Sequence, residues 1–101
     1  MNVYPFHSWG VTPREAIQLQ EQLRTKVITR GRVPKPKLVA GADAAFGMEA
    51  GWVFAVVAVL SFPALELVEA VVHQECLSFP YIPGLLSFRE APALLHAFEK
   101  V

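Results

Sequence analysis

Hydrophobic residues near the start of the chain follow a helical repeat, with intervals of three and four residues that predict an amphipathic helix of roughly four turns. The repeating positions are Ala16, Leu19, Leu23 and Val27. The helix start is predicted at Thr12, the N-cap, with Pro13 in the first position and Glu15 closing a capping box. A glycine and two prolines then indicate a loop over residues 29–36.

The middle of the chain has the pattern of three strands. Residues 38–46 form the first, and residues 52–60 form the second, which is apolar on both faces as a central strand is. Residues 65–74 alternate between apolar and polar side chains and form the third. The turns fall at residues 47–51 and 61–64, and connections this short predict an antiparallel meander.

A second helix is predicted at the end of the chain. Pro92 is tolerated only near a first turn, so the helix begins close to Ser87 or Arg89. Ser87 and Glu90 have the spacing of a second capping box. The apolar face of this helix comprises Phe88, Ala91, Leu94, Leu95 and Phe98. The predicted order is therefore helix, three strands, helix.

Composition restricts the class of protein. A chain of 101 residues forms at most one small domain, and its 53% hydrophobic content suggests apolar surface meant for a partner or for further chain. The longest apolar run, over 52–60, is far shorter than the ~20 residues that span a bilayer. The N-terminus has no signal-peptide pattern, and Cys76 is the single cysteine. We expect a soluble cytoplasmic protein without a membrane partner.

The net charge is zero, but the basic residues are unevenly distributed. Six of the nine lie between residues 24 and 37, with no acid among them. Such a segment can bind phosphates, or it can be a solvated helix end and loop. The charge pattern alone leaves both interpretations open.

Two prolines stiffen the loop before the last helix. Pro80 and Pro83 flank Tyr81 and Ile82, and Gly84 follows. Each proline fixes its own φ and favours extended geometry in the residue before it. A stiff loop that presents an aromatic ring can stack on nucleobases or wedge between them. The alternative is a structural turn with a buried tyrosine.

Two carboxylates are candidates for chemistry. Asp43 lies inside an apolar strand, where a charge is costly unless it is paired, hydrogen-bonded or bound to a metal. Glu90 either completes the capping box or faces Asp43. Two converging carboxylates form a hard-oxygen site suited to Mg²⁺ or Mn²⁺. For Asp43, a strand-end acid that accepts backbone hydrogen bonds is the structural alternative.

The histidines do not have the spacing of a metal site. His7, His73 and His96 are far apart in the sequence, and with Cys76 they form no zinc signature. His73 and Cys76 are close in sequence, but two ligands do not make a site. The sequence therefore argues against a zinc site.

Together these segments resemble the endonuclease V family, nucleases of DNA repair that act on deoxyinosine in DNA and, in some members, on inosine in RNA. The strongest match combines Pro-Tyr-Ile-Pro-Gly at 80–84 with Phe-Arg-Glu at 88–90. Ala42 departs from the pattern, since a larger aliphatic residue is usual there. The other matching segments are His7-Ser8-Trp9, Thr12-Pro13-Arg14-Glu15-Ala16-Ile17, Leu19-Gln20, Val39-Ala40-Gly41-Ala42-Asp43, Val56-Val57-Ala58-Val59-Leu60, Leu67-Val68-Glu69 and Ala91-Pro92-Ala93-Leu94-Leu95.

The resemblance implies an α/β fold of the RNase H-like type and cleavage of the phosphodiester 3′ to the inosine nucleotide, with Mg²⁺ or Mn²⁺ as cofactor. By position, Asp43 corresponds to the metal-binding aspartate and Glu90 to the catalytic, metal-binding glutamate. Tyr81 corresponds to the wedge that fills the gap left by the displaced nucleotide. Gly84 and Leu86 correspond to residues of the pocket for the flipped base. A snug pocket with a small residue suits a flipped base.

The chain also departs from the family pattern. Family members continue into a strand with a second essential aspartate in an Asp-Gly context and then a histidine-containing segment, whereas Asp43 is the only aspartate here. We therefore expect residues 1–101 to be a single partial domain, catalytically incomplete and with an unpaired sheet edge. The alternative function is a non-catalytic fragment that binds nucleic acid or associates with itself.

Overall fold

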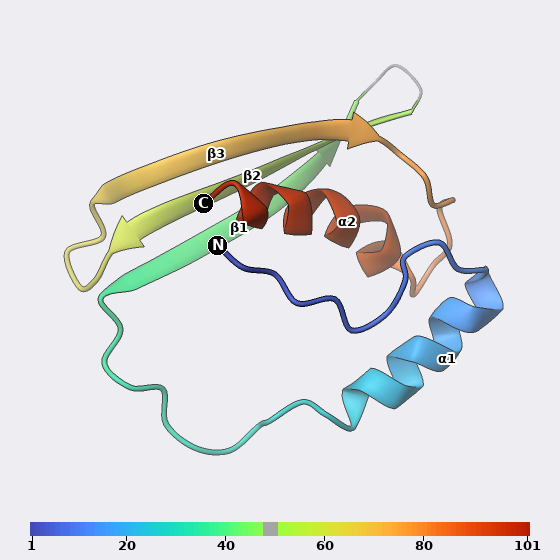
Figure 1. Cartoon of the computed structure of the whole chain (residues 1–101), viewed down its shortest axis with the longest axis horizontal. Helices are drawn as coiled ribbons and strands as arrows, with labels where there is room; N and C mark the ends of the chain where they lie inside the picture. The colour runs from blue at the N-terminus through green and yellow to red at the C-terminus, as the bar shows by residue number, and fades with distance from the viewer. Residues whose placement is uncertain (48–50) are drawn as a thin grey trace.

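A computed structural model describes residues 1–47 and 51–101 of the protein, and its element order confirms the prediction (Figure 1). The elements are α1 (Pro13–Arg24), β1 (Leu38–Phe46), β2 (Trp52–Ser61), β3 (Leu67–Cys76) and α2 (Leu86–Glu99). Strand β3 is shifted toward the C-terminus from its predicted position, and α1 ends before Val27. Residues 48–50 of the predicted turn lie outside the described residues. Neither helix in the described part is long and apolar enough to cross a membrane.

The three strands form an antiparallel sheet in the order β1-β2-β3, so the fully apolar strand is central, as predicted. The register places Asp43 of β1 opposite Val56 of β2, and Val56 opposite Val72 of β3. Residues paired directly across strands share one face of a sheet. Asp43, Val56 and Val72 therefore project from the same face.

Helix α2 lies across the other face of this sheet (Figure 1). The core between them contains Val53, Ala55, Val57, Val59, Ala93 and Ala97. Alanine at two helix positions lets the helix backbone approach the sheet closely. The predicted apolar face of α2 missed Ala93 and Ala97, while Ala91 and Leu95 instead line an apolar groove beside the N-terminal segment.

A second hydrophobic cluster joins α1 to the loop before α2. Its buried members are Ala16, Phe79, Leu85 and Phe88. The predicted capping box of α1 is confirmed: the Thr12 hydroxyl accepts from the Glu15 amide, and the Glu15 carboxylate accepts from the Thr12 amide, each at 3.2 Å. The hydrogen bond from the Thr12 backbone is the larger cause that lowers the pKa of Glu15, and the hydrogen bond with the Thr12 side chain is the smaller one.

The N-terminal segment runs back along α2, so the first and last residues of the chain lie near each other (Figure 1). The amino group of Met1 donates to the carbonyl of Phe98 at 3.1 Å and also to that of Val101. A positive charge is favourable at the carbonyl end of a helix dipole. This contact closes the C-terminal end of α2.

Candidate nucleic-acid and metal site

The loop between β3 and α2 presents Tyr81 on a hydrophobic base. Phe79 and Leu85 are 6% and 2% exposed and fill the cluster below the loop, whereas Tyr81 is 72% exposed. The interpretation of a turn with a buried tyrosine is therefore wrong, because Phe79 and Leu85 occupy the core instead. The loop holds the tyrosine ring in solvent, where it is accessible to a flat ligand.

Gly84 gives this loop its backbone conformation. Its φ is +86°, a region that residues with a Cβ rarely adopt, and a Cβ there would meet no atom within 4 Å. The side-chain amide of Gln20 donates to the Gly84 carbonyl at 3.0 Å and ties the loop to α1. Leu86, the first residue of α2, is half exposed beside it. Open surface therefore lies at the two positions predicted to line a base pocket.

Arg89 links the loop to the end of β1. The carbon of its guanidinium lies 4.6 Å from the ring centre of Phe46 and 5.7 Å from that of Tyr81. Such cation–π contacts stabilise by about 0.5–1 kcal/mol at exposed sites. Sequence analysis named Arg89 as a possible helix start and as part of the strongest motif, but predicted no contact for its side chain. Its place between Tyr81 and Glu90 in the strongest motif was the available signal.

Glu90 is not part of a cap. Helix α2 starts at Leu86 with Leu85 as N-cap and no side-chain cap bond, so the predicted Ser87–Glu90 capping box is wrong. The reason is the turn before the helix: Leu85 donates its amide to the Ile82 carbonyl, and the helix begins one residue ahead of Ser87. Glu90 is half-buried, and its carboxylate makes no capping hydrogen bond at the start of α2.

Asp43 lies near the end of β1 and is exposed. Its Oδ1 accepts a hydrogen bond from the Ala44 amide at 2.9 Å. Because Ala44 pairs with the buried Ala55, Ala44 faces α2 and Asp43 projects from the opposite face. In the described part of the chain, no hydrogen bond or ion pair joins Asp43 to Glu90.

The elements that carry the two carboxylates meet at one end of β1, where Arg89 contacts Phe46. Glu90 follows Arg89, whose guanidinium lies over Phe46, and Phe46 closes the strand three residues after Asp43. Asp43 approaches this end from one face of the sheet, and α2 approaches it from the other. Strand β1 is at the edge of the described sheet.

The basic segment begins at Arg24, the last residue of α1, and continues along the long connection to β1 (Figure 1). All its charged side chains are exposed, and none pairs with an acid in the part of the chain that the structure describes. The six residues are Arg24, Lys26, Arg30, Arg32, Lys35 and Lys37. This arrangement leaves positive charge available to phosphates.

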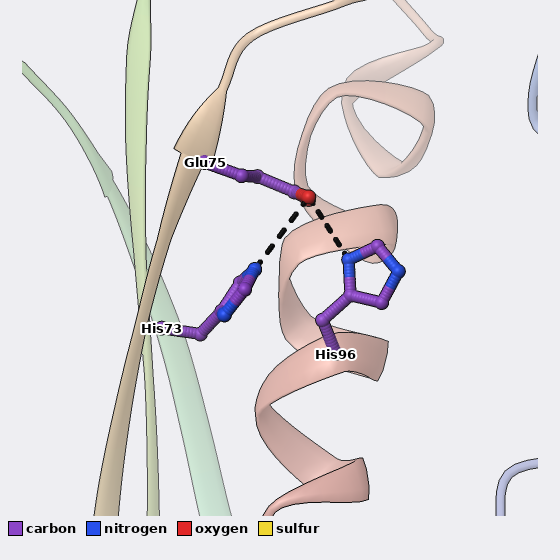
Figure 2. A group of neighbouring side chains, drawn as sticks. All are labelled: His73, Glu75 and His96. Atoms are coloured by element: carbon purple, nitrogen blue, oxygen red, sulfur yellow. Dashed lines mark hydrogen bonds and ion pairs between the residues drawn. The ribbon is translucent and has the colours of Figure 1, made fainter.

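Three other polar residues meet between β3 and α2, and sequence analysis missed them. One carboxylate oxygen of Glu75 lies 2.9 Å from Nδ1 of His96 and 3.5 Å from Nε2 of His73 (Figure 2). His73 and His96, which are far apart in the sequence, therefore lie close together in the fold. The available signal was His73 and Glu75 at alternate positions of one strand, but the sequence did not reveal that His96 packs above them.

Solved structures define the class of this fold. Endonuclease V of Streptomyces avermitilis is 38% identical and superposes with a TM-score of 0.83, over 91% of this chain and 41% of its own. Endonuclease V of Ciona intestinalis, in complex with a 24mer DNA containing an inosine followed by a ribo-adenosine, is 30% identical. It superposes with a TM-score of 0.66 over 75% of this chain and 34% of its own. The predicted RNase H-like α/β fold is confirmed.

The sequence comparisons give the family. A profile of the Endonuclease V family matches residues 21–101. The curated Endonuclease V of Trichormus variabilis is 49% identical over 102 aligned positions, which cover 100% of this chain and 46% of the relative. The chain belongs to the endonuclease V family of nucleases, and it spans about half the length of the curated relatives it matches.

Proposed function

We propose that the protein acts in endonuclease V-type repair, the metal-dependent cleavage of the phosphodiester 3′ to deoxyinosine in DNA or to inosine in RNA. The observation that carries the proposal is the loop at 79–85: it exposes Tyr81 on a buried base and leads directly into the helix that bears Glu90. Family membership supplies the reaction class.

Recognition of the damaged nucleotide is assigned to the loop. An exposed ring can enter the base stack and fill the gap left by a flipped nucleotide. Gly84 and Leu86 border open surface beside Tyr81, where a flipped base edge can approach the backbone. The Ciona intestinalis relative, crystallised with an inosine-containing DNA, supports this choice of ligand.

Asp43 and Glu90 are assigned to the metal. The donor chemistry fits a divalent cation, because both side chains offer carboxylate oxygens. Asp43 accepts one local hydrogen bond, from the Ala44 amide, and Glu90 makes no capping hydrogen bond. Mg²⁺ and Mn²⁺ prefer such ligands. When bound, the cation would activate water and stabilise negative charge on the phosphate. The second aspartate of the family pattern has no counterpart among these 101 residues.

The catalytic assignment is tested in a chimaera in which residues 1–101 replace the matching N-terminal part of the Trichormus variabilis relative. Asp43→Ala should lower cleavage of an inosine-containing oligonucleotide by at least about 100-fold, with binding largely intact. Glu66→Ala removes an exposed carboxylate from the β2–β3 turn and should cleave like the parent. Normal turnover by Asp43→Ala refutes the assignment.

The wedge is tested by binding. Tyr81→Ala in the same chimaera should weaken binding to inosine-containing strands by roughly tenfold, since base–aromatic stacking contributes about 1–3 kcal/mol. Fluorescence anisotropy against matched oligonucleotides with and without inosine measures the effect. Tyr4 is as exposed as Tyr81, so Tyr4→Ala is the control. Equal losses in both variants would contradict a wedge role.

A second function is supported by the exposed basic segment and by the outer edge of β1: binding of nucleic acid without cleavage, or self-association along that edge. The 101-residue chain is incubated with an inosine-containing oligonucleotide and Mg²⁺. Binding without cutting favours this function for the isolated chain. Cleavage that Asp43→Ala abolishes rejects it.

A further inference from the structure

We propose that His73, Glu75 and His96 form a binding site for a single Zn²⁺ ion that joins β3 to the last turns of α2. The site is separate from the proposed Asp43–Glu90 site and does not depend on it. Figure 2 shows the three side chains converging from the strand and the helix.

Local structure places the three donors together. His73 and Glu75 are two residues apart on β3, so both side chains project from one face of the strand. His73 pairs with Ala55, which is fully buried under α2, so this face is the one the helix covers. His96 lies in the last turns of α2 and completes the cluster from above.

The distances between donors suit a zinc ion. Zn–N and Zn–O bonds of about 2.0–2.2 Å in tetrahedral geometry separate neighbouring ligand atoms by roughly 3.3 Å. The two distances from the Glu75 oxygen, 2.9 Å to His96 and 3.5 Å to His73, bracket that value. All three donor atoms lie within 4.8 Å of one another. The three donors are therefore near enough to one another to share one ion.

The chemistry of the donors also points to zinc. Nε2 of His73 is buried and makes no hydrogen bond with the described residues, and the Glu75 carboxylate oxygen lies 3.5 Å from it. A metal bond would satisfy this nitrogen. Two imidazoles and one carboxylate are a ligand set for Zn²⁺, whereas Mg²⁺ prefers oxygen donors.

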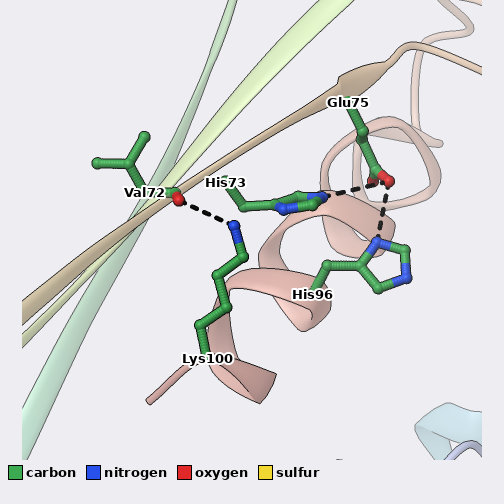
Figure 3. Close-up of polar contacts among 5 residues, drawn as sticks. All are labelled: Val72, His73, Glu75, His96 and Lys100. Atoms are coloured by element: carbon green, nitrogen blue, oxygen red, sulfur yellow. Dashed lines mark hydrogen bonds and ion pairs between the residues drawn. The ribbon is translucent and has the colours of Figure 1, made fainter.

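One side of the cluster is open to a fourth ligand. The charged neighbour, Lys100, donates from its ammonium to the Val72 carbonyl at 3.2 Å and turns away from Glu75 (Figure 3). The side chain of His96 is 48% exposed, so one side of the cluster opens to solvent. A water molecule or a small anion can complete the tetrahedron from that side.

The cluster is remote from the proposed magnesium site. Asp43 is aligned with Val72, the residue next to His73, across the central strand. Two strand spacings separate them by roughly 10 Å, and the two side chains lie on opposite faces of the sheet. Asp43→Asn should therefore leave zinc binding unchanged.

Calorimetric titration of ZnCl₂ into the 101-residue chain tests the site. We expect one ion per molecule, no competition from Mg²⁺, and a Tm raised by roughly 10 °C or more when zinc is about 100 times its Kd. Co²⁺ in place of zinc should give the visible absorption of a four-coordinate ion. If the chain is disordered without metal, zinc-induced folding seen by circular dichroism supports the site equally.

Variants separate this site from incidental binding. His96→Ala, and Glu75→Gln, which preserves the shape of the side chain, should each lower zinc affinity by more than about 100-fold. His7→Ala deletes an imidazole elsewhere in the chain. Cys76→Ser removes the thiol of the residue next to Glu75, and the Cys76 side chain projects from the face of β3 opposite the cluster. Both controls should bind zinc like the parent.

Three results would overturn the proposal. One is the absence of saturable zinc binding. Another is equal affinity in the parent and Glu75→Gln. The third is loss of binding in Cys76→Ser with retention in His96→Ala, which would assign the metal to the thiol instead.

Discussion

The two ends of α2 carry polar residues in different states. At the C-terminal end, His96 is in direct contact with Glu75 of β3. At the N-terminal end, Glu90 is half-buried and has no bond to Asp43 in the part of the chain that the structure describes. Both ends bear groups suited to a metal, but in the described structure only the C-terminal groups touch.

The difference follows from what supports each end. His96 and the two β3 residues stand on elements that share one hydrophobic core, and the two alanines of α2 bring helix and sheet close together. The N-terminal end instead rests on the cluster with α1, while Asp43 belongs to the far face of the sheet. The packing of α2 on β3 around one core therefore brings the three C-terminal side chains together. Asp43 and Glu90 do not stand on a shared core, so core packing alone does not bring them into contact.

Leu85→Ala gives the largest expected effect at the N-terminal end. Leu85 is 2% exposed, and its truncation should lower the free energy of unfolding by about 2–5 kcal/mol. The exposed neighbour Leu86 is the matched control, and Leu86→Ala should cost under about 1 kcal/mol. Urea denaturation of the chain measures both.

The same variant tests whether the two ends are independent. Where Leu85→Ala remains folded, its zinc affinity should match that of the parent, because His96 rests on the other core. A loss above about tenfold would show that the two ends are coupled, since additivity holds for sites that share no partners.

Gly84→Ala should have a smaller effect on the same end. The left-handed φ of +86° costs a residue with a Cβ roughly 1–2 kcal/mol, and no neighbouring atom would clash. Gly41 in β1 also has no atom near its would-be Cβ but lacks a positive φ, so Gly41→Ala separates strain from bulk. An equal loss of stability in both variants would contradict the conformational explanation.

Much of the fold could be predicted because local signals agree with the tertiary structure. The Thr12–Glu15 box and the apolar run of β2 each specify one element, and short turns favour antiparallel neighbours. The second capping box failed because Ser87 and Glu90 have the spacing of a cap while the preceding turn starts the helix at Leu86. Motif spacing alone does not fix a helix boundary.

Less of the site could be predicted. The Tyr81 motif indicated an aromatic loop, but its exposure depends on Phe79 and Leu85 filling the core below. The contact of His96 with β3 depends on how α2 crosses the sheet, which helical periodicity does not specify. Residues close in sequence can be assigned to a face, but contacts between elements require the packing.

The smallest expected effect concerns pH and α1, which contacts the N-terminal cluster through Ala16. The folded-state pKa of Glu15 is lowered from 4.5 by its bonds with Thr12, so the ionised form stabilises the fold above that value. This contribution is lost as the pH falls through the lowered pKa. Glu15→Gln should therefore reduce Tm slightly at pH 7, and the difference from the parent should shrink toward pH 3. Glu21→Gln, outside the capping box, should change Tm less at pH 7. Calorimetric scans at the two pH values measure these shifts, and a difference from the parent that grows toward low pH would contradict the assignment.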